Sequence, residues 1–205
     1  MIPAIETVPA LLALTAVLAY LLGSVPFGIV VTRAMGLGDL RQIGSGNIGA
    51  TNVLRTGNKL AAALTLILDA GKAGLAVLVA RATLAEDAGQ LAGFAAFLGH
   101  CYPVFLRFKG GKGVATFFGT ILALSWPVGL AACAIWVVVA ALARISSLAG
   151  LVAAALAPVA ALALGRGDAV ALLVLLGVLI FLRHAGNIRR LIAGTEPRIG
   201  KKPKP

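Results

Sequence analysis

Long apolar runs, each about as long as a helix that crosses a lipid bilayer, make up most of this chain. Hydrophobic residues account for 60% of the sequence and charged residues for only 12%, whereas soluble domains are about half apolar and about a quarter charged. We therefore expect an integral membrane protein with an all-α polytopic fold of about seven transmembrane helices. At 205 residues the chain is expected to form a single membrane domain, residues 1–205, with 198–205 as a flexible basic tail.

The apolar runs set the expected positions of the helices. We place spans at residues 7–32, 60–80, 88–106, 113–125, 127–143, 147–164 and 169–183. The stretch from Gly113 to Ala143 is too long for one helix, and Ser125-Trp126-Pro127 is the natural break because proline interrupts helical hydrogen bonding. The fourth span is then short, so a tilted or re-entrant segment is the alternative to a full crossing.

Basic residues predict the orientation of these helices in the membrane. With seven spans, most of the 18 Lys and Arg residues fall on the loops and the C-terminal tail of one side. Arg81 and Arg166 fall on the opposite side, and Lys72 lies inside a span. The positive-inside rule then places the N-terminus outside and the C-terminus in the cytoplasm. Topology alone accounts for most of the net charge of +11, so no nucleic-acid partner is expected.

Three polar, glycine-rich blocks interrupt the apolar runs, and the predicted topology puts all three at the cytoplasmic face. The first block runs from Gly44 to Asn52 and is followed by Arg55. Its Gly-x-Gly-x-x-Gly pattern formally matches a dinucleotide-binding fingerprint, but no strand precedes it and no βαβ unit fits here. Glycines still allow successive N–H groups to converge on an anion, and arginine can bind phosphate through two hydrogen bonds. A flexible polar loop is the alternative.

The second block, Lys109-Gly110-Gly111-Lys112-Gly113, is only loosely like a nucleotide-phosphate loop. A Walker A motif needs Ser or Thr after its Gly-Lys pair and a further glycine upstream, but Gly113 and Leu106 stand at those positions. ATP hydrolysis is therefore not expected. A glycine-rich turn leading into a helix near Val114 still predicts an anion site made by N–H groups, the helix dipole and lysine. A basic stop-transfer loop is the alternative.

Two histidines lie near helix ends next to these blocks. His100 is at the inner end of the third span, where a polar residue is usually functional, although a packing hydrogen bond is the alternative. His184 and Asn187 are three residues apart, which puts them on one helical face. For that basic helix end the alternative is contact with lipid headgroups. Glu196 is expected to hold the tail by pairing with a basic residue of a loop.

Asp69 and Lys72 lie three residues apart within the second span. Their simplest role is a mutual ion pair that makes the helix tolerable in lipid, and contact with substrate is the alternative. No cluster of metal-ligand residues is visible, and Cys101 and Cys133 lack the spacing of a metal or redox site. The sequence therefore predicts neither a metal nor another cofactor.

Three segments, in order, match the motifs of a known enzyme family. The first is Ser45-Gly46-Asn47-x-Gly49-Ala50-Thr51-Asn52-x-x-Arg55. The second is Gly99-His100-x-x-Pro103-Val104-Phe105-Leu106-x-Phe108-Lys109-Gly110-Gly111-Lys112-Gly113-Val114-Ala115-Thr116. The third is His184-x-x-Asn187-x-x-Arg190-Leu191-x-x-Gly194-x-Glu196. The chain thus resembles the bacterial acyl-phosphate:glycerol-3-phosphate acyltransferase family, the PlsY type, with Arg198 where a lysine is common.

The resemblance implies transfer of a fatty acyl group from acyl phosphate to the 1-hydroxyl of sn-glycerol 3-phosphate. The products would be lysophosphatidic acid and inorganic phosphate, in the first step of bacterial phospholipid synthesis. It also implies a multi-pass protein of the bacterial inner membrane, in contact with membrane lipid and with its active site facing the cytoplasm. Functional coupling to the enzyme that makes acyl phosphate is a further implication. Because an acyl phosphate is a mixed anhydride with a good leaving group, no covalent enzyme intermediate is required.

The resemblance, together with the chemistry of the side chains, assigns roles within the blocks. The residues expected to act in the reaction are Ser45, Arg55, His100, Lys112, His184 and Asn187. Those expected to bind substrate or phosphate are Gly46, Asn47, Gly49, Thr51, Asn52, Lys109, Gly110, Gly111, Gly113 and Thr116. Structural roles are expected for Asp69, Lys72 and Glu196. Lys112 would neutralise developing negative charge, and His100 would orient or deprotonate the acceptor hydroxyl, or only position it if the donor phosphate takes the proton.

A transporter or flippase for an anionic, phosphate-bearing solute or lipid is the alternative function. It would predict binding residues at the midplane, broken helices in paired halves, and internal repeats. No fixed-period repeat is visible in the chain. The His-x4-Asp motif of another acyltransferase class is also absent, since Phe105 and Arg189 stand five residues after the two histidines.

Overall fold

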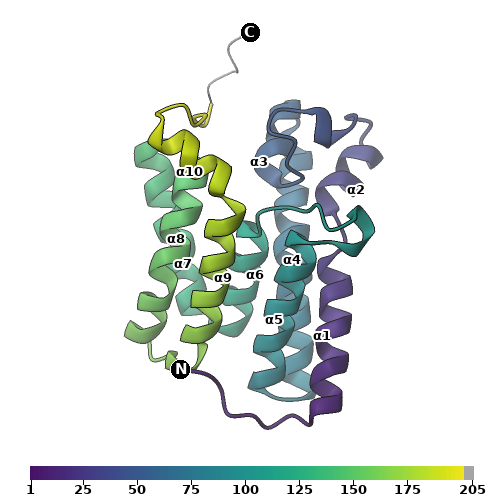
Figure 1. The fold of residues 1–205 in the computed structure, drawn as a ribbon, viewed down its shortest axis with the longest axis vertical. Coiled ribbons are helices and arrows are strands. Elements are labelled where there is room, and N and C mark those ends of the chain that lie inside the picture. Colours follow the sequence, from purple (N-terminus) through teal and green to yellow (C-terminus); the bar gives the residue numbers. More distant parts are fainter. Residues whose placement is uncertain (201–205) are drawn as a thin grey trace. The chain divides into compact units, whose positions relative to one another are not determined.

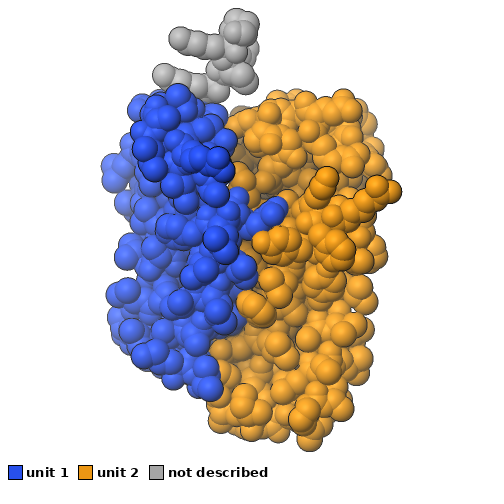
Figure 2. Space-filling view, viewed as in Figure 1, with its two compact units in different colours: residues 1–2, 127–205 blue, residues 3–126 orange. Residues whose placement is uncertain are grey.

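The computed structural model describes residues 1–200, which form helices and loops with no strand among them (Figure 1). Residues 201–205, the end of the predicted basic tail, lie outside the described residues. The chain divides into two compact units (Figure 2). Residues 1–2 with the chain from Pro127 onward form unit 1, and residues 3–126 form unit 2.

Unit 2 is a helical bundle built around one long central helix. Its α-helices are α1 (Pro9–Gly23), α2 (Phe27–Ala34), α3 (Ala50–Val53), α4 (Lys59–Thr83), α5 (Glu86–Cys101) and α6 (Val114–Leu124). Short 3-10 turns are η1 (Leu40–Gln42), η2 (Leu54–Thr56) and η3 (Val104–Leu106). The central helix is α4, because it packs against all five of the others.

Small residues allow the helices of unit 2 to approach one another closely. A Cβ added at Gly23 would lie 2.1 Å from the backbone oxygen of Ala96, and one at Gly119 would lie 2.0 Å from that of Ala70. Any larger residue at these two positions would therefore force the helices apart. Close packing of this kind drives helix association in lipid, where burying apolar side chains brings little gain.

Unit 1 contains the remaining helices of residues 1–200. They are α7 (Trp126–Ala143), α8 (Ser146–Ala163), α9 (Val170–Arg183) and α10 (Ala185–Ile192), with the 3-10 turn η4 (Gly167–Ala169) before α9. Buried alanines of α8 pack against α9, whose buried face is rich in leucine. The short helix α10 leaves α9 at a bend of 65°.

Helices occupy all the segments predicted to cross the membrane. Within residues 1–200, four segments are long and apolar enough to do so on their own: Pro9–Ala34, Lys59–Thr83, Trp126–Ala143 and Ser146–Ala163. The bent pair of α9 and α10 makes a fifth if it counts as one span. Because α5 has 16 residues and α6 has 11, both are shorter than the ~20 residues of a typical span. The all-helical membrane architecture is confirmed, and the count of seven spans and their orientation stay predictions.

Proline explains the two places where helix ends differ from the predicted spans. The first span is interrupted between α1 and α2 at Pro26, which has no N–H to donate. The third was predicted to reach residue 106 but ends at Cys101. Tyr102, directly before Pro103, has left the helical region with φ −134° and ψ 61°. The predicted break between the fourth and fifth spans is confirmed, since α7 begins at Trp126.

Candidate functional site

Asn52 organises the first glycine-rich block from within, at the end of α4 where α3 packs (Figure 1). The residue is 3% exposed. Its Nδ2 donates to the backbone oxygens of Leu40 at 3.1 Å and Ile43 at 2.8 Å. Its Oδ1 accepts from the backbone N–H of Ser45 at 3.1 Å. These bonds tie the two ends of the loop together, which differs from the predicted role of Asn52 as a phosphate ligand.

The other predicted ligands of the first block are more accessible. The exposed or half-buried ones are Ser45, Gly46, Asn47, Gly49 and Thr51. The exposed Arg55 side chain folds back over Gly44, where an added Cβ would lie 2.7 Å from Nη1. Gly44 also has φ +55°, so glycine is required both by the backbone and by the arginine. The guanidinium thus lies close to the start of the block.

An exposed ion pair precedes this block. Asp39 accepts hydrogen bonds from the Nε atom of Arg41 at 3.0 Å and from its Nη2 atom at 2.8 Å. The hydrogen bonds from Arg41 lower the pKa of Asp39 to about 2. Because both side chains are well solvated, such a pair contributes little stability. Its effect is to neutralise one of the basic residues near the block.

The loop that carries the second block folds back onto the end of α5. The N–H of Gly111 donates to the backbone oxygen of His100 at 3.0 Å. Arg107 and Phe108 adopt φ values of 51° and 62°, a left-handed conformation that is uncommon for residues with a side chain. Strain of this kind persists only where the surroundings fix the backbone, and it is frequent at functional sites.

Close packing accounts for each glycine of the second block. A Cβ at Gly110 would lie 2.2 Å from the backbone oxygen of His100, and one at Gly111 would lie 2.1 Å from the Nε2 atom of its ring. Gly113 has φ +85°, and a Cβ there would lie 2.1 Å from the ring of Phe97. The glycines are thus needed for the approach of the loop to α5, a reason that the sequence did not reveal.

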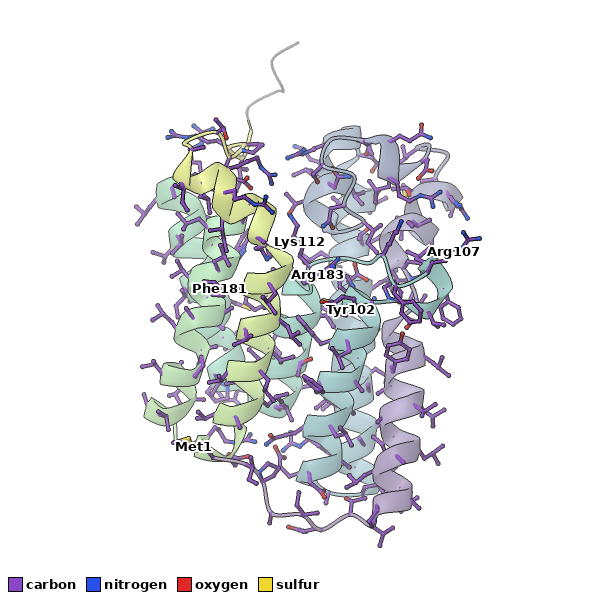
Figure 3. All side chains as sticks on the ribbon, in the orientation of Figure 1. Met1, Tyr102, Arg107, Lys112, Phe181 and Arg183 are labelled. Carbon is purple, nitrogen blue, oxygen red and sulfur yellow. The ribbon has the colours of Figure 1, made fainter. Side chains whose placement is uncertain are left out.

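The same loop delivers Lys112 to the start of α6 (Figure 3). Lys112 is half-buried, whereas Lys109 is exposed. The N-cap residue of α6 is Gly113, which has no side chain to cap the helix, and the first N–H groups of α6 carry partial positive charge that favours an anion. Thr116, in this turn, is fully buried, and its Oγ1 has no hydrogen-bond partner within residues 1–200. The start of α6 therefore combines the features of an anion site.

His100 belongs to a buried charged cluster that the sequence predicted only in part. The predicted ion pair is present, with the Nζ atom of Lys72 2.9 Å from the Oδ1 atom of Asp69. The same Nζ lies 3.1 Å from the Nδ1 atom of His100 and donates to the backbone oxygen of Val25 at 2.8 Å. Val25 stands at the break before Pro26, where helical hydrogen bonding fails. That carbonyl also accepts the backbone N–H of Phe27 at 3.1 Å, so the lysine adds a second hydrogen bond to it.

Glu196 holds the third block together within unit 1. Its Oε1 accepts from the Ser147 hydroxyl at 2.7 Å and from the Asn187 amide, and its Oε2 accepts from the Nε atom of Arg190 at 2.7 Å. Burial disfavours the charged carboxylate, but these three hydrogen bonds outweigh it and lower the pKa of Glu196. The basic partner is Arg190 of α10, a helix residue rather than the loop residue that was expected. The contact with Ser147, which lies 49 residues away, had no signal in the sequence.

His184 sits at the bend between α9 and α10, rather than within one helix that continues to Asn187. Its backbone N–H reaches both Ile180 and Phe181, which tightens the chain at this point. Its Nδ1 lies 2.8 Å from the backbone oxygen of Ile180, and this contact fixes the ring. His184 and Asn187 are both buried, at 3% and 7% exposure.

The first two blocks belong to unit 2 and the third to unit 1. Within unit 2, one apolar cluster supports the first block and contacts the η3 turn that precedes the second block. Its buried members include Leu40, Ile48 and Val53, and Leu106 of η3 packs against them. Segments that are far apart in the sequence are therefore supported by one core.

Neither a metal-ligand cluster nor a disulfide is found in the part of the chain that the structure describes. Among residues 1–200, no three His, Cys, Asp or Glu side chains are arranged to hold a metal ion. Cys101 is a buried free thiol and Cys133 a half-buried one.

Comparison with known proteins gives one consistent result. The family model described as glycerol-3-phosphate acyltransferase matches residues 13–194. The glycerol-3-phosphate acyltransferase of Jannaschia sp. (strain CCS1) is 72% identical over 201 residues, which cover 98% of this chain and 99% of that protein. The protein of the same name from Cereibacter sphaeroides (strain ATCC 17025 / ATH 2.4.3) is 66% identical over 200 residues, covering 98% and 95%.

Solved structures agree with the sequence comparisons. The crystal structure of PlsY (YgiH), an integral membrane glycerol 3-phosphate acyltransferase, in its glycerol 3-phosphate form superposes with a TM-score of 0.87 at 39% identity, over 92% of this chain and 96% of that chain. Its lysophosphatidic acid form gives a TM-score of 0.86 at 38% identity, over 92% and 95%. The chain therefore belongs to the glycerol-3-phosphate acyltransferase family.

Proposed function

We propose that this protein transfers a fatty acyl group from acyl phosphate to the 1-hydroxyl of sn-glycerol 3-phosphate, releasing lysophosphatidic acid and inorganic phosphate. The observation that carries this proposal is the tightly packed glycine loop that brings Lys112 to the uncapped start of α6. Family membership supports the acceptor, since the related PlsY structures are named for glycerol 3-phosphate and lysophosphatidic acid.

The reaction exchanges one bond at the acyl carbon. The hydroxyl oxygen of the acceptor forms a bond to that carbon, and the bond from the carbon to the bridging phosphate oxygen breaks. The hydroxyl proton passes to an oxygen of the donor phosphate, which leaves as inorganic phosphate. Because phosphate is already a good leaving group, the chain needs to supply charge neutralisation and orientation rather than a nucleophile.

Lys112 and the first N–H groups of α6 neutralise the charge that develops on the departing phosphate and on the carbonyl oxygen. Gly110, Gly111 and Gly113 let the loop pack against α5 and so place Lys112 at the start of α6, and Thr116 adds a buried hydroxyl in the first turn of that helix. Fixed donors of this kind, aimed at a charge that forms in the transition state, are each worth about 10²- to 10³-fold in rate. Lys109 adds an exposed positive charge at the entrance of the loop.

Ser45 and Arg55 bind and orient a substrate phosphate at the first block. The guanidinium is planar and can donate two parallel hydrogen bonds to phosphate oxygens. Gly46, Asn47, Gly49 and Thr51 supply N–H, amide and hydroxyl groups nearby. Asn52 acts as a positioning residue, since its amide is already bonded to the loop that it shapes.

His100 serves as a positioning residue rather than as a general base. Its Nδ1 faces the Lys72 ammonium at 3.1 Å, and its Nε2 lies against Gly111. A ring enclosed on both edges is poorly placed to reach the acceptor hydroxyl. In unit 1, His184 and Asn187 are retained as substrate-contacting residues, with Glu196 as the residue that fixes Asn187.

The distribution of charged residues indicates how the protein lies in its membrane. We infer that the protein lies in the bacterial inner membrane with its polar blocks toward the cytoplasm, because most basic residues fall on that side. Acyl phosphate, an amphiphile, would then be supplied by a coupled enzyme on the same side. The acyl tail remains in lipid while both phosphate groups stay at the polar surface.

The test uses purified protein in lipid with palmitoyl phosphate and glycerol 3-phosphate, and it measures inorganic phosphate and lysophosphatidic acid together. Equal amounts of both products are expected, with palmitoyl-CoA inactive as donor. Turnover with palmitoyl-CoA alone would refute the donor assignment. Absence of both products would refute the reaction, and transport of glycerol 3-phosphate would then be measured in the same vesicles.

A further inference from the structure

A continuous chain of contacts runs from a buried ion pair on α4 to the loop of the second block. Asp69 pairs with Lys72, and Lys72 contacts the His100 ring on α5. The other edge of that ring lies against Gly111, directly before Lys112. Asp69, Lys72 and His100 are only 2%, 4% and 4% exposed. An ion pair that merely neutralises a membrane helix does not need a histidine between itself and the loop.

The surroundings of Lys72 match a charged ammonium with all of its donors engaged. An ammonium has three N–H donors and no acceptor. Three acceptors lie within 3.1 Å of its nitrogen: the Asp69 carboxylate, the Val25 carbonyl and the Nδ1 atom of His100. The face of the Phe27 ring lies 5.7 Å away and adds a favourable cation–π contact.

The lysine in turn dictates the tautomer of the histidine. Because the ammonium can only donate, the Nδ1 atom of His100 must accept, and the ring proton then resides on Nε2. The alternative, an Nδ1–H donated to Asp69, would use a longer contact of 3.5 Å. The edge of the ring that carries the proton therefore faces Gly111 and the loop.

We propose that Asp69 and Lys72 are positioning residues of the acyltransferase, which hold His100 in its Nε2–H tautomer and thereby fix the loop that carries Lys112. This deepens the proposed function and rests on it. Asp69 orients the ammonium, Lys72 orients the ring, and the ring sets the position of Gly111. None of the three contacts the reacting atoms.

The competing role is a purely structural ion pair. In that case, replacing both charges with apolar residues of similar size should leave a folded and active enzyme, since buried pairs are often replaced without loss of stability. The positioning role predicts a folded enzyme that is slow. The pair of substitutions Asp69→Leu and Lys72→Met, made together, separates the two roles.

The experiment compares wild type with this double variant in lipid nanodiscs, by thermal unfolding, steady-state kinetics and ¹⁵N NMR of labelled histidine. The spectrum is simple because the chain has 2 histidines. We expect an Nε2–H signature for His100 in wild type and a changed one in the variant. We also expect kcat to fall by about ten- to a hundredfold with little change in KM, as for a misplaced catalytic group.

A second variant tests whether the effect acts through the ring. His100→Gln keeps an N–H donor toward the loop without depending on Lys72. In that background the double substitution should lower kcat far less than in wild type, because residues that act as one unit are not additive.

Two results would overturn the proposal. One is an Nδ1–H or doubly protonated His100 in wild type, which needs no variant to fold. The other is a double variant with wild-type kcat. If wild type itself does not turn over palmitoyl phosphate and glycerol 3-phosphate, the proposed function fails, and the NMR result still reports separately on the tautomer.

Discussion

Gly111→Ala is the substitution that most directly probes the contact between the loop and His100. The added Cβ would meet the His100 ring itself: it would lie 2.1 Å from Nε2, 2.8 Å from Cε1 and 2.9 Å from Cδ2. Ordinary carbon contacts need about 3.5 Å or more, so the ring or the loop must move by more than about 1 Å. A shift of this size either breaks the 3.1 Å contact from the ring to Lys72 or displaces the loop that carries Lys112.

The magnitude of the effect follows from this displacement. Overpacking a well-packed interior costs about 1–3 kcal/mol of stability, and moving a catalytic group by about 1 Å costs about a hundredfold in rate. We therefore expect Gly111→Ala to remain folded with kcat about two orders of magnitude below wild type. Phosphate release in nanodiscs measures the rate, and a thermal melt measures the fold.

The matched control is Gly71→Ala. Gly71 lies on α4, and an added Cβ there meets nothing within 4 Å. Alanine in a helix is more favourable than glycine by about 1 kcal/mol, so this variant should be slightly more stable and fully active. A Gly111→Ala enzyme with the same kcat as the Gly71→Ala control would show that the contact between the loop and His100 does not matter for the rate.

Three further predictions concern the first two blocks and the opposite end of unit 2. Lys112→Ala should lower kcat by about 10²–10³-fold in a kinetic assay. The control Arg107→Gln removes an exposed charge from the same loop (Figure 3) and should leave kcat unchanged. Equal losses of kcat in the two variants would contradict a specific role for Lys112. Asn52→Ala should destabilise the protein by at least about 2 kcal/mol in chemical unfolding, because it leaves buried loop groups without partners, and an unchanged midpoint would argue against its positioning role. Asp87 is buried and yet accepts hydrogen bonds from the backbone of residues 6 and 7 and from a threonine hydroxyl, which outweigh burial and lower its pKa. Its contribution to stability is therefore complete above the unfolded-state pKa of about 3.9 and is lost as the pH falls through the lower folded pKa; thermal melts of Asp87→Asn should show a weaker pH dependence below about pH 4 than wild type, and parallel curves would disprove the link.

Local signals in the sequence predicted the helices well. Long apolar runs locate α4, α7 and α8 to within a few residues, and Pro127 marks the start of α7. The ends of the first and third spans were predicted less well, although Pro26 and Pro103 were visible. The apolar pattern continues past both prolines. Hydropathy alone therefore predicts a continuous helix, although proline interrupts the helical backbone there.

In the candidate site, contacts between residues close in the sequence could be predicted, whereas contacts between distant residues could not. The spacing of Asp69 and Lys72 predicted their ion pair, because residues three apart share a helical face. The contacts of Lys72 with His100 and Val25 span 28 and 47 residues and depend on how the helices pack. No local pattern contains that information.

The reason why a position requires glycine could not be predicted from the sequence either. The pattern around Gly111 suggested an anion-binding backbone, but its immediate structural cause is the ring that lies against it. Only the packed bundle reveals which neighbour requires the missing side chain.

In the proposed reaction, the acceptor oxygen attacks the acyl carbon of an acyl phosphate. The most direct test of this step supplies sn-glycerol 3-phosphate carrying ¹⁸O in the 1-hydroxyl, together with palmitoyl phosphate, and follows the products by mass spectrometry. All of the label should appear in the ester bridge of lysophosphatidic acid and none in inorganic phosphate. Loss of the label from the ester, or formation of a doubly phosphorylated glycerol with free palmitate, would contradict the proposed reaction.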